Sequence, residues 1–502
     1  MSNTLRPKTL GQLKASGYTA RGVKEEIRGN LVRTLRRGEE LFPGIVGYED
    51  TVVPQLVNAV LARHDFILLG LRGQAKTRIL RAMVNFLDEA VPVVPGAPLN
   101  DDPMEPVSSE ARRRVFEEGD DLAIEWLERD ARYQEKLATP DVTIADLIGD
   151  LDPIKAASLK LAYSDERVIH YGIIPRTNRG IFAINELPDL QPRIQVGLLN
   201  ILEERDFQIR GFPVRIPLDV QMVFSANPED YTNRGNIITP LRDRIQSQIL
   251  THYPRSIEEG MKITQQEAWL ERGDHRVDVP RFLREVIEEV AVQARESEYV
   301  DQNSGVSARM TIALAETVVS NAEQRAIKLG SPCAMARVCD LAAAVSAVSG
   351  KVELVLEGEQ EGPLNVARHL IGRGLKSYFA RTFPSAFPKK RRGQQAAEEG
   401  LANSEYKEIV EWFAAGHSVE VADDSTDAQF LEALDTVKGL RRVATKHLKP
   451  AGDAELAVAM EFALEGLHQH SILTRDRVDG RSVTYRDMFK SMFSSLGGGD
   501  EA

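Results

Sequence analysis

Apolar residues form short continuous runs in one part of the chain and helical patterns elsewhere. Between about residues 45 and 251, apolar runs such as Phe66–Leu69, Ile181–Ile184 and Val220–Ala226 alternate with helical stretches. Such runs are typical of strands buried on both faces of a parallel sheet, and their alternation with helices favours an α/β layer. We therefore predict a parallel sheet flanked by helices in this part of the chain.

Helical periodicity dominates on either side of this layer. Apolar residues recur every four positions from Val23 to Leu35, which predicts a leading helix that ends near Gly38. From about Pro254 onward the pattern is again mostly helical. We predict four parts, which are an N-terminal helical segment at 1–41, an α/β domain at 42–253, an all-helical lid at 254–380, and a linker with a mostly helical C-terminal extension at 381–502.

Composition indicates a packed protein of several domains. The 502 residues exceed what one hydrophobic core usually serves, and 42% hydrophobic with 27% charged residues is an ordinary globular balance. The net charge of −12 disfavours nucleic acid and anionic lipid as partners. The basic cluster Lys389–Arg392 lies in a Pro-rich stretch, and we interpret it as part of a solvated linker.

The two cysteines and the absence of long apolar segments indicate in which cellular compartment the protein is expected. Cys333 and Cys339 are too few for a disulfide framework or a thiolate zinc site, so we interpret both as core residues of a helical stretch. No run approaches the ~18 apolar residues of a membrane span, and the first residues lack the apolar region of a signal peptide. We expect a cytoplasmic protein with no membrane partner.

A candidate phosphate-binding loop follows the first apolar run. The pattern G-x-x-x-x-G-K-[ST] fits at Gly70, Lys76 and Thr77, with Ala75 in place of the second glycine. In such loops backbone N–H groups face the phosphates, the lysine reaches the β- and γ-phosphates, and the hydroxyl ligates Mg²⁺. ATP and Mg²⁺ are therefore the expected cofactors. The candidate phosphate-binding residues are Gly70, Leu71, Arg72, Gly73, Gln74, Ala75, Lys76, Thr77 and Arg78.

A second candidate element ends the apolar run that begins at Gly180. Asn185 and Glu186 follow this run at the position of a Walker B motif, where one side chain holds Mg²⁺ through water and the next polarises the attacking water. Glu186 fits the second task. Asn185 stands where an aspartate is usual and supplies an oxygen without charge, so we expect weakened Mg²⁺ binding and slow turnover. The alternative is that the pair only caps the next helix.

Polar residues at the end of the layer complete the candidate site. Asn227 ends the run Val220–Ala226 and is placed to reach the γ-phosphate or the attacking water. Arg242 and Arg244 follow, and neither has an evident carboxylate partner nearby in the sequence. Either is a candidate for an arginine that acts on the neighbouring subunit's nucleotide, with a surface salt bridge as the alternative.

From about Phe42 to Gly350, this set resembles the AAA+ ATPases of the MoxR type and the I subunit of magnesium chelatase. In that family alanine commonly precedes the Lys-Thr pair of the loop. The resemblance implies two hairpins facing a ring pore, at His170–Gly180 and Phe207–Pro217. The family roles carried over are adenine packing for Ile45, Val46 and Gly47, sensor 1 for Asn227, the arginine finger for Arg244 rather than Arg242, and sensor 2 on the lid for Arg309.

The resemblance also implies a function. Members of this group work as hexamers beside a partner protein that contains a von Willebrand factor A domain. They remodel this partner or help it to insert a metal. The nearest match here to the metal-binding motif of that domain, Asp423–Asp427, lacks its final serine, so we expect the partner to be a separate chain. The segments Asn100–Gln134 and beyond Gly374 match no part of the family pattern.

Three alternatives stay open at this point. One is a DNA-acting AAA+ motor, which the acidic balance disfavours. Another is a nucleotide-dependent switch or scaffold with negligible hydrolysis because of Asn185. A transcriptional activator of the enhancer-binding type is disfavoured because the sequence has no Gly-Ala-Phe-Thr-Gly-Ala motif and no evident helix-turn-helix.

Overall fold

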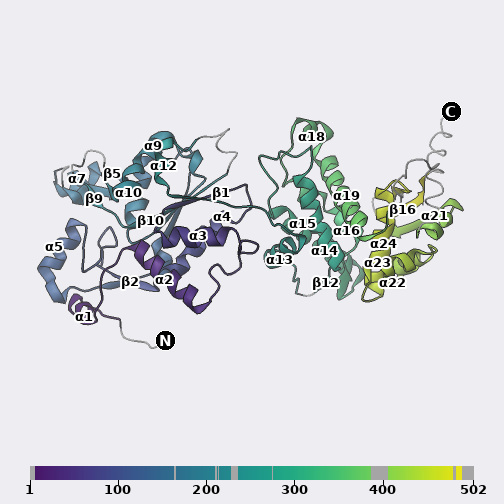
Figure 1. The fold of residues 1–502 in the computed structure, drawn as a ribbon, viewed down its shortest axis with the longest axis horizontal. Helices are drawn as coiled ribbons and strands as arrows, with labels where there is room; N and C mark the ends of the chain where they lie inside the picture. The colour runs from purple at the N-terminus through teal and green to yellow at the C-terminus, as the bar shows by residue number, and fades with distance from the viewer. Residues whose placement is uncertain are drawn as a thin grey trace. The chain divides into compact units, whose positions relative to one another are not determined.

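The computed structural model contains two compact units, Met1–His252 and Tyr253–Ala502 (Figure 1). The residues it describes are 6–162, 165–209, 212, 214–227, 236–273, 275–385, 405–478 and 482–488. The basic cluster Lys389–Arg392 lies outside them. Within the described residues, no helix is both long and apolar enough to cross a membrane.

A parallel five-stranded sheet forms the centre of the first unit, with the strand order β11-β1-β10-β7-β4. Its strands are β1 (Phe66–Leu69), β4 (Tyr133–Leu137), β7 (Gly180–Asn185), β10 (Val220–Ala226) and β11 (Ser247–Leu250). β10 lies between β1 and β7, so the carboxyl ends of the three predicted strands meet at one edge of the sheet, where ligands of open α/β sheets bind. The predicted α/β class is confirmed.

Helices cover both faces of this sheet because successive strand residues point to opposite sides. Phe66 and Leu68 belong to one core, and Ile67 between them belongs to the other. The helices of the first core are α2 (Val23–Arg37), α3 (Val52–Leu61) and α4 (Lys76–Ala82), and those of the second include α9 (Pro192–Gly197), α10 (Leu199–Glu203) and α12 (Thr239–Arg244). The leading helix α2, predicted to end near Gly38, ends at Arg37 and packs directly on the α/β core.

Residues 100–134, which no sequence pattern placed, contribute to a small module beside the sheet. Its elements are α1 (Leu10–Ala15), β2 (Ala90–Val93), α5 (Ser109–Glu118) and β3 (Glu125–Glu128). Leu10 and Leu13 share a core with Ala111 and Leu122. The stretch then ends in edge strand β4, so this segment supplies part of the main sheet as well.

The two expected hairpins have different outcomes. The pair β8 (Asp206–Phe207) and β9 (Ile216–Pro217) is antiparallel, as expected for Phe207–Pro217. The expectation for His170–Gly180 is wrong in detail, because β6 (Ile169–Tyr171) pairs with the upstream β5 (Gly149–Leu151) and the short helix α8 (Ile173–Arg176) follows it. Between β5 and β6 lie α7 (Pro153–Leu159) and η4 (Glu166–Val168), and α6 (Ile144–Leu147) precedes β5.

The second unit begins with a helical region. Its helices are α13 (Ile257–Glu267), α14 (Arg281–Arg295), α15 (Arg309–Leu329), α16 (Val338–Ala343), α17 (Val345–Ser349), α18 (Leu356–Glu361) and α19 (Pro363–Thr382). A short parallel pair, β12 (Arg276–Asp278) and β13 (Cys333–Met335), interrupts the predicted all-helical pattern. Cys339 on α16 is buried as predicted, whereas the prediction for Cys333 is wrong, since it is exposed on β13 rather than buried in a helix.

The C-terminal extension is mostly helical, as predicted, and also contains a sheet that the sequence did not reveal. The helices are α21 (Lys407–Ala414), α22 (Asp427–Asp435), α23 (Leu440–Leu448) and α24 (Asp453–Gln469). The antiparallel strands, in the order β14-β16-β15, are β14 (Val419–Ala422), β15 (Leu473–Val478) and β16 (Ser482–Asp487).

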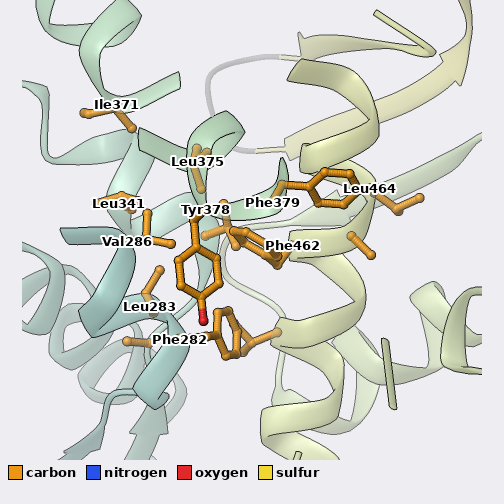
Figure 2. Close-up of a cluster of buried hydrophobic side chains, with 14 of the residues drawn as sticks. Phe282, Leu283, Val286, Leu341, Ile371, Leu375, Tyr378, Phe379, Phe462 and Leu464 are labelled. Atoms are coloured by element: carbon orange, nitrogen blue, oxygen red, sulfur yellow. The ribbon is translucent and has the colours of Figure 1, made fainter. Parts of the chain in front are cut away.

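α24 packs on the helices before the linker through one continuous core, in which Phe379 and Phe462 approach each other (Figure 2). A Cβ on Gly466 of α24 would lie 2.0 Å from the Phe379 ring, so glycine allows this close packing. The extension is therefore structurally continuous with the helical region.

Candidate nucleotide site

The predicted phosphate loop connects β1 directly to α4. Gly73 and Ala75 both have positive φ angles, 75° and 54°, which give the loop its tight turn. A Cβ on Gly70 would lie 2.0 Å from Thr251 Oγ1 and 2.2 Å from Gln74 Oε1, so any larger residue there would displace these two side chains. The unusual Ala75 thus adopts the left-handed conformation that a glycine would otherwise supply.

A chain of hydrogen bonds joins three strand ends at the edge of the sheet. Lys76, which is 7% exposed, donates from Nζ to Asn227 Oδ1 at 2.6 Å and also to the carbonyl oxygens of Gly70 and Leu71. Asn227 Nδ2 in turn donates to Glu186 Oε2 at 2.8 Å. The structure therefore brings together Lys76, Asn227 and Glu186 from three separate parts of the sequence.

Asn185 and Thr77 form the candidate metal-binding part. Thr77 Oγ1 lies 3.5 Å from Asn185 Oδ1, and Asn185 is 8% exposed. Hydroxyl and amide oxygens are acceptable ligands for Mg²⁺ or its bound waters, so this pair of donors fits the ion. Among the described residues, no cluster of three or more histidine, cysteine or acidic side chains offers another metal site.

Glu186 has a strained backbone and no helix-capping bond. Its φ of 56° and ψ of 50° lie in the left-handed region, which is uncommon for a residue other than glycine. It precedes the short helix η5 (Leu187–Asp189), but its side chain makes no capping hydrogen bond there. The interpretation of Glu186 as only a helix cap therefore has no support in the geometry, and the side chain is directed instead to Asn227.

The segment Ile45–Gly47 is linked to the phosphate loop through the next residue, Tyr48. The Tyr48 hydroxyl lies 3.0 Å from the carbonyl oxygen of Gln74 and 2.8 Å from that of His252, and its ring packs against the His252 ring. Thr251 Oγ1 donates to Gln74 Oε1 at 2.7 Å. The loop is thereby fixed to the last residues of the first unit.

The three candidate arginines occupy different surroundings. Arg244 binds Glu203, with Nε 2.7 Å from Oε2, and this partner was not evident because it lies 41 residues earlier. Arg242 is exposed, and among the described residues no hydrogen bond or ion pair of its side chain is found, although its backbone N–H donates to the carbonyl oxygen of Ile238 at 3.1 Å. Arg309 is the first residue of α15 in the second unit. Among the described residues, no hydrogen bond or ion pair joins Arg242 or Arg244 to Lys76 or Glu186.

Sequence reasoning missed several residues of this site. Ser225 on β10 donates to Asn185 Oδ1 at 3.1 Å, and its own position in an apolar run gave no signal. Tyr48, Thr251 and His252 act on the loop across separations of 26 to 204 residues, which no local pattern reveals.

Comparisons with known proteins find partial matches to this chain. A family model described as the sigma-54 interaction domain matches residues 158–250, which contain β7, β10 and β11. The archaeal Lon protease of Thermococcus kodakarensis is 28% identical over 203 residues, which are 37% of this chain and 30% of that protein. The chain thus spans less than a third of that relative's length. These matches support the AAA+ ATPase family and do not distinguish the MoxR subgroup.

Similar solved structures are more distant. A chain of the complex between subunits BchI and BchD of magnesium chelatase is 21% identical with a TM-score of 0.34, and the match covers 64% of this chain and 98% of that one. NtrX from Brucella abortus in complex with ATP is 14% identical with a TM-score of 0.32, covering 58% of this chain and 52% of that one.

Proposed function

We propose, with the AAA+ ATPase family as the premise, that this chain forms a homo-oligomeric ring, a hexamer, that couples ATP binding and hydrolysis to the remodelling of a partner protein or to assisted metal insertion. The observation that carries the proposal is the hydrogen-bonded series Lys76–Asn227–Glu186 at the carboxyl edge of the sheet. It joins a phosphate-binding lysine to a carboxylate that can polarise water.

Each side chain of the series has a defined task. Lys76 leaves its carbonyl partners and binds the β- and γ-phosphates of ATP. Glu186 orients the attacking water and accepts its proton, while Asn227 holds the carboxylate in place. Thr77 and Asn185 would hold Mg²⁺, which would supply neutralisation of the charge that develops on the phosphate oxygens. Ile45, Val46 and Gly47 pack on adenine.

Residues outside this series complete the proposal. Arg244, or the exposed Arg242, acts on the nucleotide of the neighbouring subunit, and Arg244 must first release Glu203. Arg309 contacts the γ-phosphate from the second unit. The β8–β9 hairpin and the β5–β6 pair face the ring pore and contact the client, which we propose to be a separate protein with a von Willebrand factor A domain.

A trap variant tests this function. Glu186→Gln keeps the hydrogen bond from Asn227 possible but removes the base, so we expect ATP binding and ring assembly to persist while hydrolysis falls by about 10²-fold or more. Light scattering would measure assembly, phosphate release would measure hydrolysis, and a pull-down with ATP would recover the client. If wild-type protein neither assembles with ATP nor hydrolyses it, the proposal fails.

Asn185 determines whether hydrolysis or switching dominates. Its amide oxygen carries no charge, so the wild-type site holds Mg²⁺ less strongly than an aspartate would. A large rise in turnover in Asn185→Asp would favour the nucleotide-dependent switch, because binding would then be intact and hydrolysis limited by this residue. No change in turnover would exclude the switch.

The family-model match favours a second candidate, remodelling of a sigma-54-containing transcription complex. The matched range covers elements common to AAA+ sheets, and the sequence lacks the Gly-Ala-Phe-Thr-Gly-Ala motif. Binding of purified sigma-54 by the Glu186→Gln protein with ATP would support this candidate over the von Willebrand factor A partner.

A further inference from the structure

Ser225 contacts both candidate Walker B residues, Asn185 and Glu186, from the neighbouring strand β10. It belongs to β10, is 1% exposed, and precedes Asn227 by two positions. Its hydroxyl lies 3.1 Å from Asn185 Oδ1 and 3.4 Å from the backbone N of Glu186. One buried hydroxyl therefore contacts both residues that follow each other at the end of β7.

The directions of these two hydrogen bonds follow from the donors present. The Glu186 N–H can only donate, so Ser225 accepts that bond and has one proton of its own left to give. That proton goes to Asn185 at 3.1 Å, and the receiving atom of an amide must be its oxygen. The same oxygen faces Thr77 Oγ1 at 3.5 Å. The NH₂ group of Asn185 consequently points away from Thr77.

We propose that Ser225 is a positioning residue that fixes the Asn185 amide with its oxygen toward Thr77 and the metal, and that this bond lets asparagine serve at a position where aspartate is usual. The proposal rests on the proposed function, because it requires a nucleotide bound with Mg²⁺. Mg²⁺ accepts oxygen ligands, so an amide turned by half a rotation would present N–H donors to the metal and its waters and weaken binding.

The inference predicts that Ser225 affects Mg²⁺ binding only because residue 185 is an asparagine, since its bond from the Glu186 N–H is the same in both backgrounds. An aspartate has two equivalent oxygens and presents an acceptor to Thr77 in either orientation. Loss of the Ser225 hydroxyl should therefore weaken Mg²⁺ binding with Asn185 and leave it almost unchanged with aspartate. A serine that only packs in the core would have the same effect in both backgrounds.

The test is a double-mutant cycle on the full chain. Wild type, Ser225→Ala, Asn185→Asp and the double variant are titrated with Mg²⁺ in the presence of a fluorescent ATP analogue, and the readout is nucleotide binding rather than hydrolysis. We expect Ser225→Ala to raise the Mg²⁺ concentration at half-saturation by about 3- to 10-fold, the effect of one neutral hydrogen bond. The double variant should stay within about twofold of Asn185→Asp, because either carboxylate oxygen of the aspartate can face Thr77.

Other outcomes overturn the inference. Equal shifts in the two backgrounds would make Ser225 a structural residue only, and no shift in either would remove any role in orienting Asn185. Thermal unfolding of all four proteins separates loss of folding, which affects both serine-to-alanine variants, from loss of orientation. If wild type binds the nucleotide with Mg²⁺ but the effect of Ser225→Ala does not depend on residue 185, only the role of Ser225 fails. If wild type shows no Mg²⁺-dependent binding, the proposed function fails with it.

Discussion

Asn227, which follows β10, donates a hydrogen bond of 2.8 Å to the carboxylate of Glu186, which follows the neighbouring strand β7. The same amide accepts from Lys76 at 2.6 Å through its oxygen, so both ends of one side chain are used. Asn227 therefore sets the distance between the phosphate-binding lysine and the candidate base.

Replacing Asn227 with alanine should separate binding from hydrolysis. Lys76 keeps its charge for the phosphates, but Glu186 loses the donor that orients it. We expect the turnover number to fall by about 10²-fold, as for loss of a positioned catalytic donor, with nucleotide affinity within about threefold of wild type. Asn200→Ala, on an exposed position of α10, is the matched control and should behave as wild type. Equal losses of turnover and affinity would contradict this role.

Replacing Tyr48 with phenylalanine tests how the phosphate loop is held. The variant keeps the ring packing on His252 and loses the hydroxyl contacts to the carbonyls of Gln74 and His252. We expect nucleotide affinity to fall by about 3- to 10-fold, which corresponds to one neutral hydrogen bond.

Tyr18→Phe provides the control for this variant. The Tyr18 hydroxyl donates to Asp102 in the same unit, and among the described residues it makes no hydrogen bond to the phosphate loop. It should lower the melting temperature without changing nucleotide affinity. Similar affinity losses in Tyr18→Phe and Tyr48→Phe would mean that the loop responds only to overall stability.

The central strands were predictable because they are buried on both faces. β7 and β10 are buried at every position, so their apolar runs are continuous. β4 and β11 lie at the two edges of the sheet and are only partly buried, and their sequences Tyr133–Leu137 and Ser247–Leu250 mix polar and apolar residues. Nothing local distinguishes such an edge strand from a loop.

The site was predictable to the extent that it follows strand ends. Lys76 was found from the phosphate-loop pattern, and Glu186 and Asn227 were found because each follows an apolar run that predicts a buried strand. Ser225 was not, since its partner Asn185 is 40 residues away and a serine in an apolar run has no distinctive pattern. The Glu203 partner of Arg244 was missed for the same reason.

A buried ion pair joins the leading helix α2 to Arg132, the residue just before edge strand β4. Arg132 donates to both carboxylate oxygens of Glu26 at 2.7 and 2.6 Å, and the side chains are 1% and 3% exposed. Glu26→Gln leaves the arginine charge buried without its partner, so we expect a loss of about 3–5 kcal/mol in the free energy of unfolding. Urea denaturation measures it.

A double variant separates the lost pair from lost packing. Removing both charges with Glu26→Gln and Arg132→Met should recover much of the stability, since a neutral pair leaves no uncompensated charge. A loss below about 1 kcal/mol in Glu26→Gln, the range of exposed pairs, would contradict the burial of this pair.

The second unit should lose stability as the pH rises through the neutral range. Burial raises the pKa of Glu288 from 4.5 to about 7, against the hydrogen bond from Thr264 and the charge of Arg295. The folded protein therefore retains a proton that the unfolded chain releases above pH 4.5. This contribution is complete below pH 4.5 and is lost as the pH approaches 7, at up to about 1.4 kcal/mol per pH unit.

Glu288→Gln should flatten this dependence. Thermal unfolding between pH 4.5 and 7 would show a shallower fall in melting temperature than in wild type. A slope remains because burial also raises the pKa of Glu461 to about 7. An unchanged profile in Glu288→Gln would show that Glu288 is ionised in the folded protein throughout this range.

The most direct test of the account is equilibrium binding of ATP with Mg²⁺ to the full chain and to Lys76→Ala. The account predicts Mg²⁺-dependent binding by wild type, a loss of about 10- to 100-fold in affinity for Lys76→Ala, as for a charged hydrogen bond, and no change for the exposed control Lys328→Ala. Equal affinity in wild type and Lys76→Ala, or no binding by either, would contradict it.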